Sequence, residues 1–284
     1  MPTNQPKWDT ITIVGVGLIG GSIGLALKKR GLARRIIGVG RRQASLDLAI
    51  GCGAIDEGVT DVSTGVAEAH LVVICTPVDK IVSHVLAAGQ ACREGALITD
   101  AGSTKEAIVR EVEKATPSEN VSFVGSHPLA GSEKTGCENG EADLFLGRTC
   151  VVTPTSATRA EDCQAIIEFW QSIGMNVEQM TPADHDAALA CTSHLPHVVA
   201  SALAAATAED QLPLVAGGWL DTTRIAAADP QLWRQILLDN QQNTLAALDE
   251  FQSKLNGFRD AIAESNGPAL EQLLENGKQR RDSR

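Results

Sequence analysis

The sequence predicts an α/β domain with a doubly wound parallel sheet over residues 1–181, followed by an all-helical domain over residues 182–284. Three observations support this prediction. In the first half, short β-branched runs alternate with helical stretches, the order typical of parallel strands joined by crossover helices. The apolar runs are nearly continuous, as strands covered on both faces require. After residue 182 these runs end, and Ala, Leu, Gln, Asp and Glu dominate.

The expected elements follow one another in a regular order. We expect buried strands at residues 11–16, 35–39, 71–75, 96–99 and 121–124, with helices between them at about 20–31, 43–51, 78–92 and 104–115. A strand at 149–153, a helix at about 158–173 and a strand at 176–180 complete the first domain. In the second domain, an alanine-rich helix over 187–208 is interrupted near Pro196, and residues 232–258 place Leu, Ile and Phe at helical intervals.

Two features of the helical half have further consequences. Asp229 and Pro230 have the residue types preferred at a helix N-cap and at the first helical position, so a helix should begin there. Alanine-rich faces allow helices to pack closely. We therefore expect a homodimer built through the helical domain.

Composition limits the possible partners. The chain has 24 Lys and Arg against 35 Asp and Glu, a net charge of −11, so global attraction to nucleic acid or to an anionic membrane is not expected. No run reaches the roughly 18 apolar residues of a membrane span, and the polar N-terminus does not resemble a secretory signal. Seven scattered cysteines without a C-x-x-C pair predict reduced thiols in a cytoplasmic protein.

A glycine motif follows the first predicted strand and opens the first helix. Its residues are Gly15, Val16, Gly17, Leu18, Ile19 and Gly20. In a Rossmann-type domain the first glycine allows a tight turn, the second lets backbone N–H groups approach a pyrophosphate, and the third lets helix pack on strand. A glycine-rich turn without a ligand is the alternative, which the strand–turn–helix context disfavours. We assign the motif, together with Thr76 and Pro77 after the strand at 71–75, to a dinucleotide site.

The charges near this motif favour NADP over NAD. An NAD site usually has an acidic residue about 20 residues after the motif, but here Gly40, Arg41 and Arg42 occupy that place. No Asp or Glu occurs between Asp9 and Asp47. That interval contains Lys28, Lys29, Arg30, Arg34, Arg35, Arg41 and Arg42. Because two guanidinium groups can bind a 2′-phosphate, we expect Arg41 and Arg42 to select NADP, with NAD as the alternative.

Five motifs together resemble one known family. They are residues 17–22 (GLIGGS), 100–105 (DAGSTK), 125–133 (GSHPLAGSE), 192–197 (TSHLPH) and 221–226 (DTTRIA). In this order and spacing they closely resemble the prephenate/arogenate dehydrogenase family of tyrosine biosynthesis, over roughly residues 10–260. The resemblance implies oxidative decarboxylation of a cyclohexadienol, a small-molecule substrate. Hydride leaves the carbon that bears the hydroxyl, and the ring carboxylate leaves as carbon dioxide.

The resemblance also implies roles for three residues. His127 matches the catalytic histidine, and a neutral imidazole can accept the hydroxyl proton. Ser103 matches a serine that hydrogen-bonds the same hydroxyl, although it could equally cap the helix that begins beside it. Arg224 matches an arginine that binds a substrate carboxylate, and the alternative is a salt bridge to Asp221, three residues earlier.

For four further residues the resemblance implies a place near the substrate. By resemblance, Ser193 and His197 line the substrate side, Glu133 is a pocket glutamate and Trp233 forms a wall of the pocket, although Trp233 could be a core residue and Glu133 an ordinary loop acid. His185 and His194 could orient neighbours or pack. The spacing of these histidines and Cys191 lacks the usual zinc pattern, so we expect no metal.

Two rival functions remain open. One is a β-hydroxyacid-dehydrogenase-like enzyme, but those use a lysine from the helical half, and no lysine lies between Lys134 and Lys254. The other is a non-catalytic dinucleotide-sensing module, against which the pairing of His127 with Arg224 argues. The sequence does not distinguish prephenate from arogenate.

Overall fold

The strand order determines where a ligand site can form in this molecule. The computed structural model describes residues 6–115, 121–132 and 134–283. Within these residues, eight strands form one sheet in the order β3-β2-β1-β4-β5-β6-β7-β8. They are β1 (Trp8–Val14), β2 (Ala33–Val39), β3 (Glu57–Val59), β4 (Leu71–Ile74), β5 (Leu97–Asp100), β6 (Ser122–Pro128), β7 (Thr149–Thr153) and β8 (Asn176–Gln179). The sheet grows first on one side of β1 and then on the other, so it is doubly wound with its switch point between β1 and β4.

The sheet is parallel from β3 to β6, but β7 runs antiparallel to β6. The predicted doubly wound parallel sheet is confirmed as a mostly parallel one, and this pair is the departure from it. A parallel strand needs a crossover connection, usually a helix, whereas the described part of the connection from β6 to β7 contains only the short 3-10 helix η1 (Cys137–Asn139). Residues 125–128 pair with β7, which extends β6 beyond its predicted end at Val124 and places His127 within a strand.

Two short elements were not predicted. β3 has three residues and the helix α3 (Val62–Val66) has five, too few for a periodic pattern to identify. The remaining strands and helices of the sheet domain are confirmed within a few residues of their predicted ends. These helices are α1 (Leu18–Arg30), α2 (Gln43–Gly51), α4 (Val78–Ala91), α5 (Glu106–Ala115) and α6 (Ala160–Ser172).

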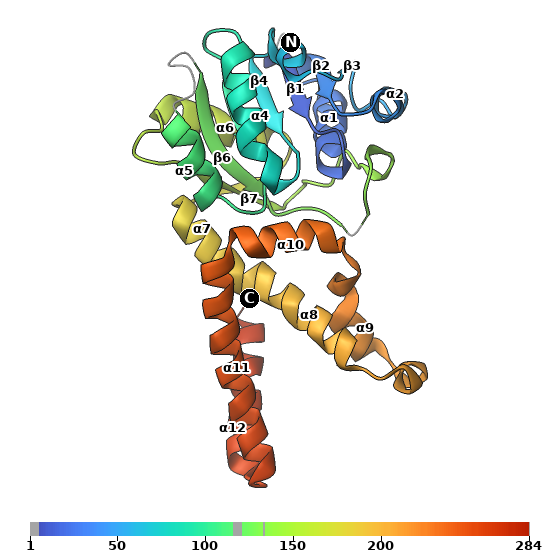
Figure 1. Ribbon diagram of the computed structural model, residues 1–284, viewed down its shortest axis with the longest axis vertical. Helices are drawn as coiled ribbons and strands as arrows, with labels where there is room; N and C mark the ends of the chain where they lie inside the picture. Colours follow the sequence, from blue (N-terminus) through green and yellow to red (C-terminus); the bar gives the residue numbers. More distant parts are fainter. Residues whose placement is uncertain (1–5, 116–120, 133, 284) are drawn as a thin grey trace, which may run out of the picture.

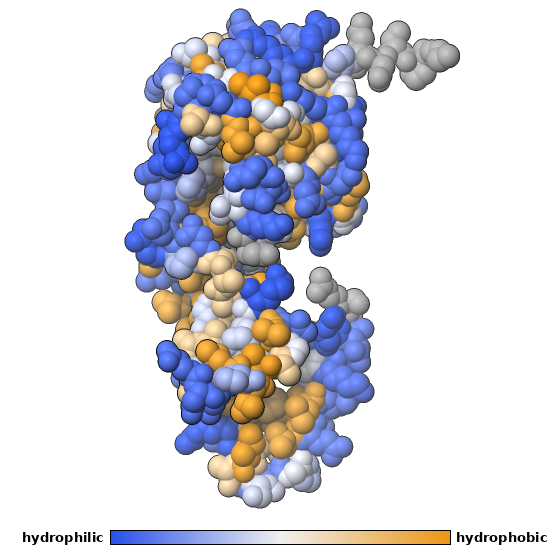
Figure 2. All heavy atoms as spheres, turned by 90° about the vertical axis from the view of Figure 1, so that its right-hand side faces the viewer, coloured by the Kyte–Doolittle hydropathy of each residue, from blue (hydrophilic) through white to orange (hydrophobic). Residues whose placement is uncertain are grey.

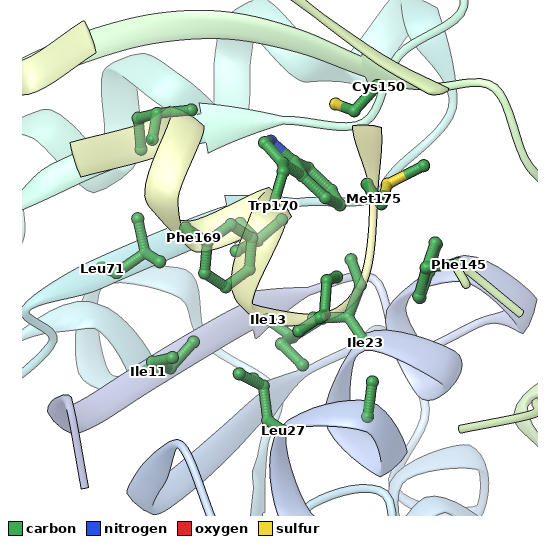
Figure 3. Close-up of a cluster of buried hydrophobic side chains, with 14 of the residues drawn as sticks. Ile11, Ile13, Ile23, Leu27, Leu71, Phe145, Cys150, Phe169, Trp170 and Met175 are labelled. Atoms are coloured by element: carbon green, nitrogen blue, oxygen red, sulfur yellow. The ribbon is translucent and has the colours of Figure 1, made fainter. Parts of the chain in front are cut away.

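Helices cover both faces of the sheet, which explains the continuous apolar runs. On one face α1, α2 and α6 pack against Ile11, Ile13 and other residues of β1 and β4. Figure 3 shows this cluster, in which Phe169 and Trp170 of α6 lie over β1 and α1. On the other face α3, α4 and α5 pack against the alternate residues of the same strands, such as Val72. Because successive side chains of a strand point to opposite faces, each strand supplies both cores.

The second half of the chain is helical, as predicted. Its elements are α7 (Pro182–Leu189), the π-helical turn η2 (Ala190–His194), α8 (Leu195–Ala206), η3 (Glu209–Leu214), α9 (Gly217–Thr223), η4 (Arg224–Ala227), α10 (Pro230–Asp239), α11 (Gln241–Ala263) and α12 (Gly267–Asp282). The Asp229 side chain accepts a hydrogen bond from the Gln231 N–H, which confirms the predicted N-cap of α10. Figure 1 shows α11 and α12 extending away from the sheet domain.

The predicted interruption near Pro196 takes the form of a π-helical turn. Proline has no N–H to donate to the preceding turn, and η2 widens the helix directly before it. The helix therefore continues from Pro182 to Ala206. By length and composition alone this helix could cross a membrane, a criterion that core helices of globular domains also meet. Its buried side chains include His185, Asp186 and His194.

The helical domain contacts the sheet domain at the carboxyl ends of the strands. α7 packs against α5 and β7, and α10 packs against α4. In Figure 1 both α7 and α10 lie directly below the sheet domain. Open α/β sheets bind their ligands at this edge, so the contact between domains lies where a substrate and a cofactor would meet.

Candidate active site

The glycine turn has the geometry of a pyrophosphate site. Gly15 has a φ of +96°, a left-handed conformation that favours glycine. A Cβ at Gly20 would overlap the Gly15 carbonyl, so only glycine lets α1 pack this closely. By contrast, nothing lies within 4 Å of the place where a Cβ at Gly17 would be. Gly17 is the N-cap of α1 and no described side chain caps it. The N–H groups at Leu18 and Ile19, the first residues of α1, therefore begin a helix suited to an anion.

A second turn lies against the glycine turn. A Cβ at Gly15 would lie 2.7 Å from the Cys75 carbonyl oxygen and 3.0 Å from Cγ2 of Thr76. Thr76 follows β4, and Pro77 is the N-cap residue of α4. A hydrogen bond of 3.0 Å joins Thr76 Oγ1 to His84 Nδ1 and holds the threonine side chain. These contacts bring Thr76 and Pro77 to the switch point between β1 and β4, beside the turn to which the sequence assigned them.

The basic cluster divides into paired and unpaired residues. Five of its members form ion pairs: Lys28 with Asp56, Lys29 and Arg30 with Asp143, Arg34 with Asp9, and Arg35 with Glu57 and Glu68. In the described residues no ion pair involves Arg41 or Arg42. Both are exposed directly after β2, at the carboxyl edge of the sheet. Of the cluster, these two arginines remain available to a ligand.

His127 lies in a short chain of hydrogen bonds. Its Nδ1 is 2.9 Å from Nε2 of His185 on α7, and Nδ1 of His185 is 2.7 Å from Oδ1 of Asp186. Burial lowers the pKa of His127 well below that of an ordinary histidine, and the nearby Lys105 ammonium acts in the same direction. His127 is therefore neutral at physiological pH, the state in which it can accept a proton.

The same aspartate caps a helix of the sheet domain. Asp186 accepts hydrogen bonds from the backbone N–H groups of Lys105 (2.8 Å) and Glu106 (2.9 Å) at the start of α5. The alternative in which Ser103 caps this helix is wrong, because α5 begins at Glu106 and a carboxylate about 80 residues away in the chain accepts from its first N–H groups. Ser103 lies in the half-buried turn between β5 and α5, at the carboxyl edge.

A buried ion pair lies beside this turn. Asp100 and Lys105 are both completely buried, and the Lys105 ammonium contacts Oδ2 of Asp100. The carboxylate also accepts hydrogen bonds from the N–H groups of Ser126 (3.0 Å) and Gly102 (2.9 Å). Ser126 precedes His127 in β6, so the ion pair connects the β5–α5 turn to the strand that carries the histidine. A buried lysine is rarely tolerated without a partner, and here Asp100 provides one.

Two further histidines surround Trp233. The rings of His197 and Trp233 stack with centroids 3.4 Å apart, and His194 meets the same indole edge-on at 6.2 Å. Burial lowers the pKa of His194 to about 4 and lowers that of His197. Trp233 also packs against the apolar cluster of α4 and α5. The indole therefore belongs to the core and also lies against two of the candidate site residues. Ser193 is half-buried on η2, directly before His194.

The remaining predicted site residues are less closely connected. Arg224 is exposed on η4, which packs against α8, the helix that carries His197. Within the described ranges no hydrogen bond or ion pair joins Arg224 to His127 or to Asp221. The alternative of a salt bridge to Asp221 is therefore wrong. Glu133 lies outside the described residues.

Sequence reasoning missed three residues of this region. Lys105 was part of a motif but had no assigned role, and Asp186 and Asn240 were not considered. Asn240 Nδ2 donates to the Asp186 carbonyl oxygen (2.7 Å) and to Nδ1 of His194 (3.1 Å), so it joins α11 to α7 and η2. An acidic residue directly after His185 was the available signal for Asp186. Nothing in the local sequence pointed to Asn240.

The fold and the site together define a two-domain oxidoreductase. A Rossmann-type domain carries an uncapped glycine turn, and a neutral histidine lies where the helical domain meets the carboxyl edge of the sheet. Residues 23–179 match the model of the prephenate dehydrogenase nucleotide-binding domain, and residues 181–276 match that of the prephenate dehydrogenase dimerization domain. The chain belongs to the prephenate dehydrogenase family.

Individual relatives agree with this assignment. The chain is 36% identical to prephenate dehydrogenase of Bacillus subtilis, over 98% of this chain and 76% of the relative. It is 34% identical to cyclohexadienyl dehydrogenase of Zymomonas mobilis, over 96% and 94% of the two chains. Prephenate dehydrogenase from Aquifex aeolicus, solved with hydroxyphenyl propionate and NAD+, has a TM-score of 0.89 at 32% identity and covers 97% of this chain and 98% of its own. Arogenate dehydrogenase from Synechocystis has a TM-score of 0.81 at 31% identity, over 96% and 99%.

Proposed function

We propose that this enzyme oxidatively decarboxylates prephenate to 4-hydroxyphenylpyruvate, arogenate to tyrosine, or both, within tyrosine biosynthesis. The observation that carries the proposal is the neutral imidazole of His127 at the carboxyl edge of the sheet, hydrogen-bonded to His185 (2.9 Å). The names of the relatives support this substrate class. The family resemblance of the surrounding motifs supports the assignment of His127 as the base.

The chemistry requires little covalent work from the protein. His127 accepts the hydroxyl proton as the C–H bond breaks and its electron pair leaves as hydride, which bound NADP or NAD would accept. The bond to the ring carboxylate then breaks, its electron pair makes the ring aromatic, and the oxygen takes a proton back. Ser103, in the turn between β5 and α5, would hydrogen-bond the same hydroxyl. The protein mainly positions the substrate and polarises its hydroxyl.

The helical domain would supply the rest of the substrate site. Arg224 would pair with a carboxylate, since it is exposed and has no described ion-pair partner. Ser193, His197 and Trp233 would line the side of the pocket formed by the helices, where His197 and Trp233 already stack. The assignment of Glu133 as a pocket glutamate rests on the family resemblance alone.

A spectrophotometric assay tests the function directly. We expect absorbance at 340 nm to rise when the protein is mixed with NADP and either prephenate or arogenate. Comparing both substrates with NADP and with NAD identifies the preferred pair. No increase with any of the four combinations would reject the proposed activity and would favour a dinucleotide-sensing module.

We further propose that NADP is the preferred cofactor. Five of the seven cations in the basic cluster are neutralised by carboxylates, but Arg41 and Arg42 are exposed and unpaired in the described structure. They follow β2, where a Rossmann domain meets the ribose of its cofactor. A 2′-phosphate there would bind two guanidinium groups and meet no nearby carboxylate in the sequence from residue 10 to 46.

The double variant Arg41→Ala/Arg42→Ala should reduce the preference for NADP over NAD. Hydrogen bonds to charged groups contribute about 1.5–3 kcal/mol each, so losing two of them should lower the ratio of kcat/KM values by roughly 10²- to 10⁴-fold, mainly through the KM for NADP. Arg34→Ala is the matched control, because Arg34 pairs with Asp9 at the other edge of the sheet. An unchanged cofactor preference in the double variant would show that these arginines do not bind the phosphate.

The helical domain also supports a homodimer. Many large apolar side chains are exposed on it, and Figure 2 shows apolar residues gathered over this lower half of the molecule. They are Leu203, Leu212, Leu214, Leu220, Leu232, Leu238, Leu245, Leu255, Ile262 and Leu274. α12 has no buried residue in the single chain. Exposed apolar surface of this kind typically marks an interface, and the matching family domain is described as a dimerization domain.

Light scattering at micromolar concentration should give twice the 29.9 kDa mass of one chain. Leu245 and Ile262 are 52% and 62% exposed on α11. Burying one such side chain contributes about 1.5–3 kcal/mol, so Leu245→Glu/Ile262→Glu should shift the protein toward monomer. Leu48→Glu, an equally drastic change on the sheet domain, should leave the mass unchanged. A monomeric wild-type protein would reject the dimer.

A further inference from the structure

We propose that Asp186 and His185 are positioning residues that fix the tautomer of His127, so that its Nε2 is the atom that accepts the proton. The effect that we expect on kcat rests on the proposed function. Its structural part, the location of the protons on three side chains, rests on the hydrogen bonds with His185 taken as neutral, and does not depend on the proposed function.

The carboxylate of Asp186 has three hydrogen-bond partners. Two of its partners are the backbone N–H groups of Lys105 and Glu106, which can only donate. Both carboxylate oxygens are therefore acceptors at the N-terminus of α5, where the helix dipole favours a negative charge. The third partner is Nδ1 of His185, 2.7 Å from Oδ1. The hydrogen of that bond consequently belongs to Nδ1 of His185.

The tautomer of His185 determines that of His127. In a neutral imidazole with hydrogen on Nδ1, the other nitrogen is an acceptor. Nε2 of His185 lies 2.9 Å from Nδ1 of His127, so Nδ1 of His127 donates this bond. The unprotonated nitrogen of His127 is then Nε2. His185 is completely buried, and Asn240 donates to the backbone carbonyl of Asp186, so both residues are held in place.

The surroundings of His127 favour a neutral imidazole before the reaction begins. Burial disfavours a second proton on His127, and the Lys105 ammonium acts in the same direction. When His127 accepts the hydroxyl proton, its Nδ1–H still donates to His185, which in turn donates to the carboxylate. The charge that forms on His127 is thus connected to Asp186 through one imidazole, the arrangement by which an acid orients a histidine base.

The hydrogen-bonded series from His127 through His185 to Asp186 also explains why the site needs both domains. His127 and α5 belong to the sheet domain, whereas His185 and Asp186 belong to α7 of the helical domain. Asp186 binds the start of α5 and orients His185 at the same time. Docking of α7 therefore sets the histidine and the turn that carries Ser103 together.

Nitrogen-15 NMR of protein labelled on histidine tests the tautomer without substrate. We expect His127 in the wild-type protein to carry hydrogen on Nδ1 and none on Nε2. His127→Asn identifies its signals. The opposite tautomer, or a mixture of the two, would overturn the proposal whether or not the chain oxidises prephenate or arogenate.

Turnover provides the second measurement. His185→Phe keeps a planar ring but removes the acceptor, and we expect kcat to fall by about 10- to 100-fold, as for partners that orient a functional histidine, with the substrate KM changed less than about threefold. His185→Gln retains an oxygen that can accept a hydrogen bond from Nδ1 of His127, so this variant should recover most of kcat. It also keeps the test valid if the His185→Phe protein does not fold. His70→Gln is the control, because His70 bonds Arg93 at the amino edge of the sheet. Unchanged kcat in a folded His185→Phe protein would overturn the positioning role.

Discussion

His127→Asn should lower kcat by about two to four orders of magnitude, because a positioned general base contributes roughly 10²- to 10⁴-fold. Asparagine can still donate a hydrogen bond to His185 but cannot take up the hydroxyl proton. The cofactor Kd should change little, since the glycine turn is separate from β6. Steady-state kinetics and a cofactor titration measure the two effects.

The pH profile gives the same prediction an independent check. The pKa of His127 is lowered by burial, so the protonated, inactive form accumulates only well below the ordinary histidine range. kcat/KM should therefore stay on its plateau at pH 6.5 and fall at more acidic pH. A folded His127→Asn variant that loses less than threefold in kcat would exclude His127 as the base, as would a wild-type acidic limb centred on an ordinary histidine pKa with no dependence on this residue.

Lys105→Met should cause the largest loss of stability of the changes considered. It removes the partner of the Asp100 carboxylate, which is completely buried. Breaking a buried ion pair from one side costs about 3–5 kcal/mol in the free energy of unfolding, because an uncompensated charge remains in the interior. Urea denaturation measures this difference. The variant should also raise the pKa of His127, since the Lys105 charge helps to lower it, and so move the acidic limb of kcat/KM to higher pH.

Lys254→Met is the matched control for this prediction. Lys254 pairs with Glu250 on α11, but both side chains are 68% exposed. Exposed pairs of this kind contribute about 0–1 kcal/mol. If Lys105→Met and Lys254→Met lost similar amounts of stability, the Asp100–Lys105 pair would have no special part in the fold.

Much of the sheet domain could be predicted because its signals are local. β1, β4 and β5 are buried on both faces, so their apolar runs are continuous and easily distinguished from helices. The glycine motif follows from the need for close approach at Gly15 and Gly20, which the structure bears out. The N-cap at Asp229 is equally local. β3 and α3 escaped because three and five residues carry too little pattern.

The errors have a common cause in contacts between distant segments. The direction of β7 depends on how the chain returns after β6, which no residue within β7 encodes. Ser103 looked like the cap of α5, yet Asp186 supplies the cap from about 80 residues away. A cap needs only a carboxylate at the correct point in space, and sequence distance does not restrict where it comes from.

The sequence by itself determined the order of a sheet domain and a helical domain and the position of the glycine turn, and it predicted roles for Arg41, Arg42 and His127. Each of these is a property of one short segment with its own geometry or charge. Only the tertiary structure decided which cations were already neutralised, which carboxylate satisfied α5, and which nitrogen of His127 contacts His185. The ion pairs of the cations join distant segments of the sheet domain. The other two outcomes depend on distances of about 3 Å between α7, α5 and β6, which arise only when the helical domain docks on the carboxyl edge of the sheet.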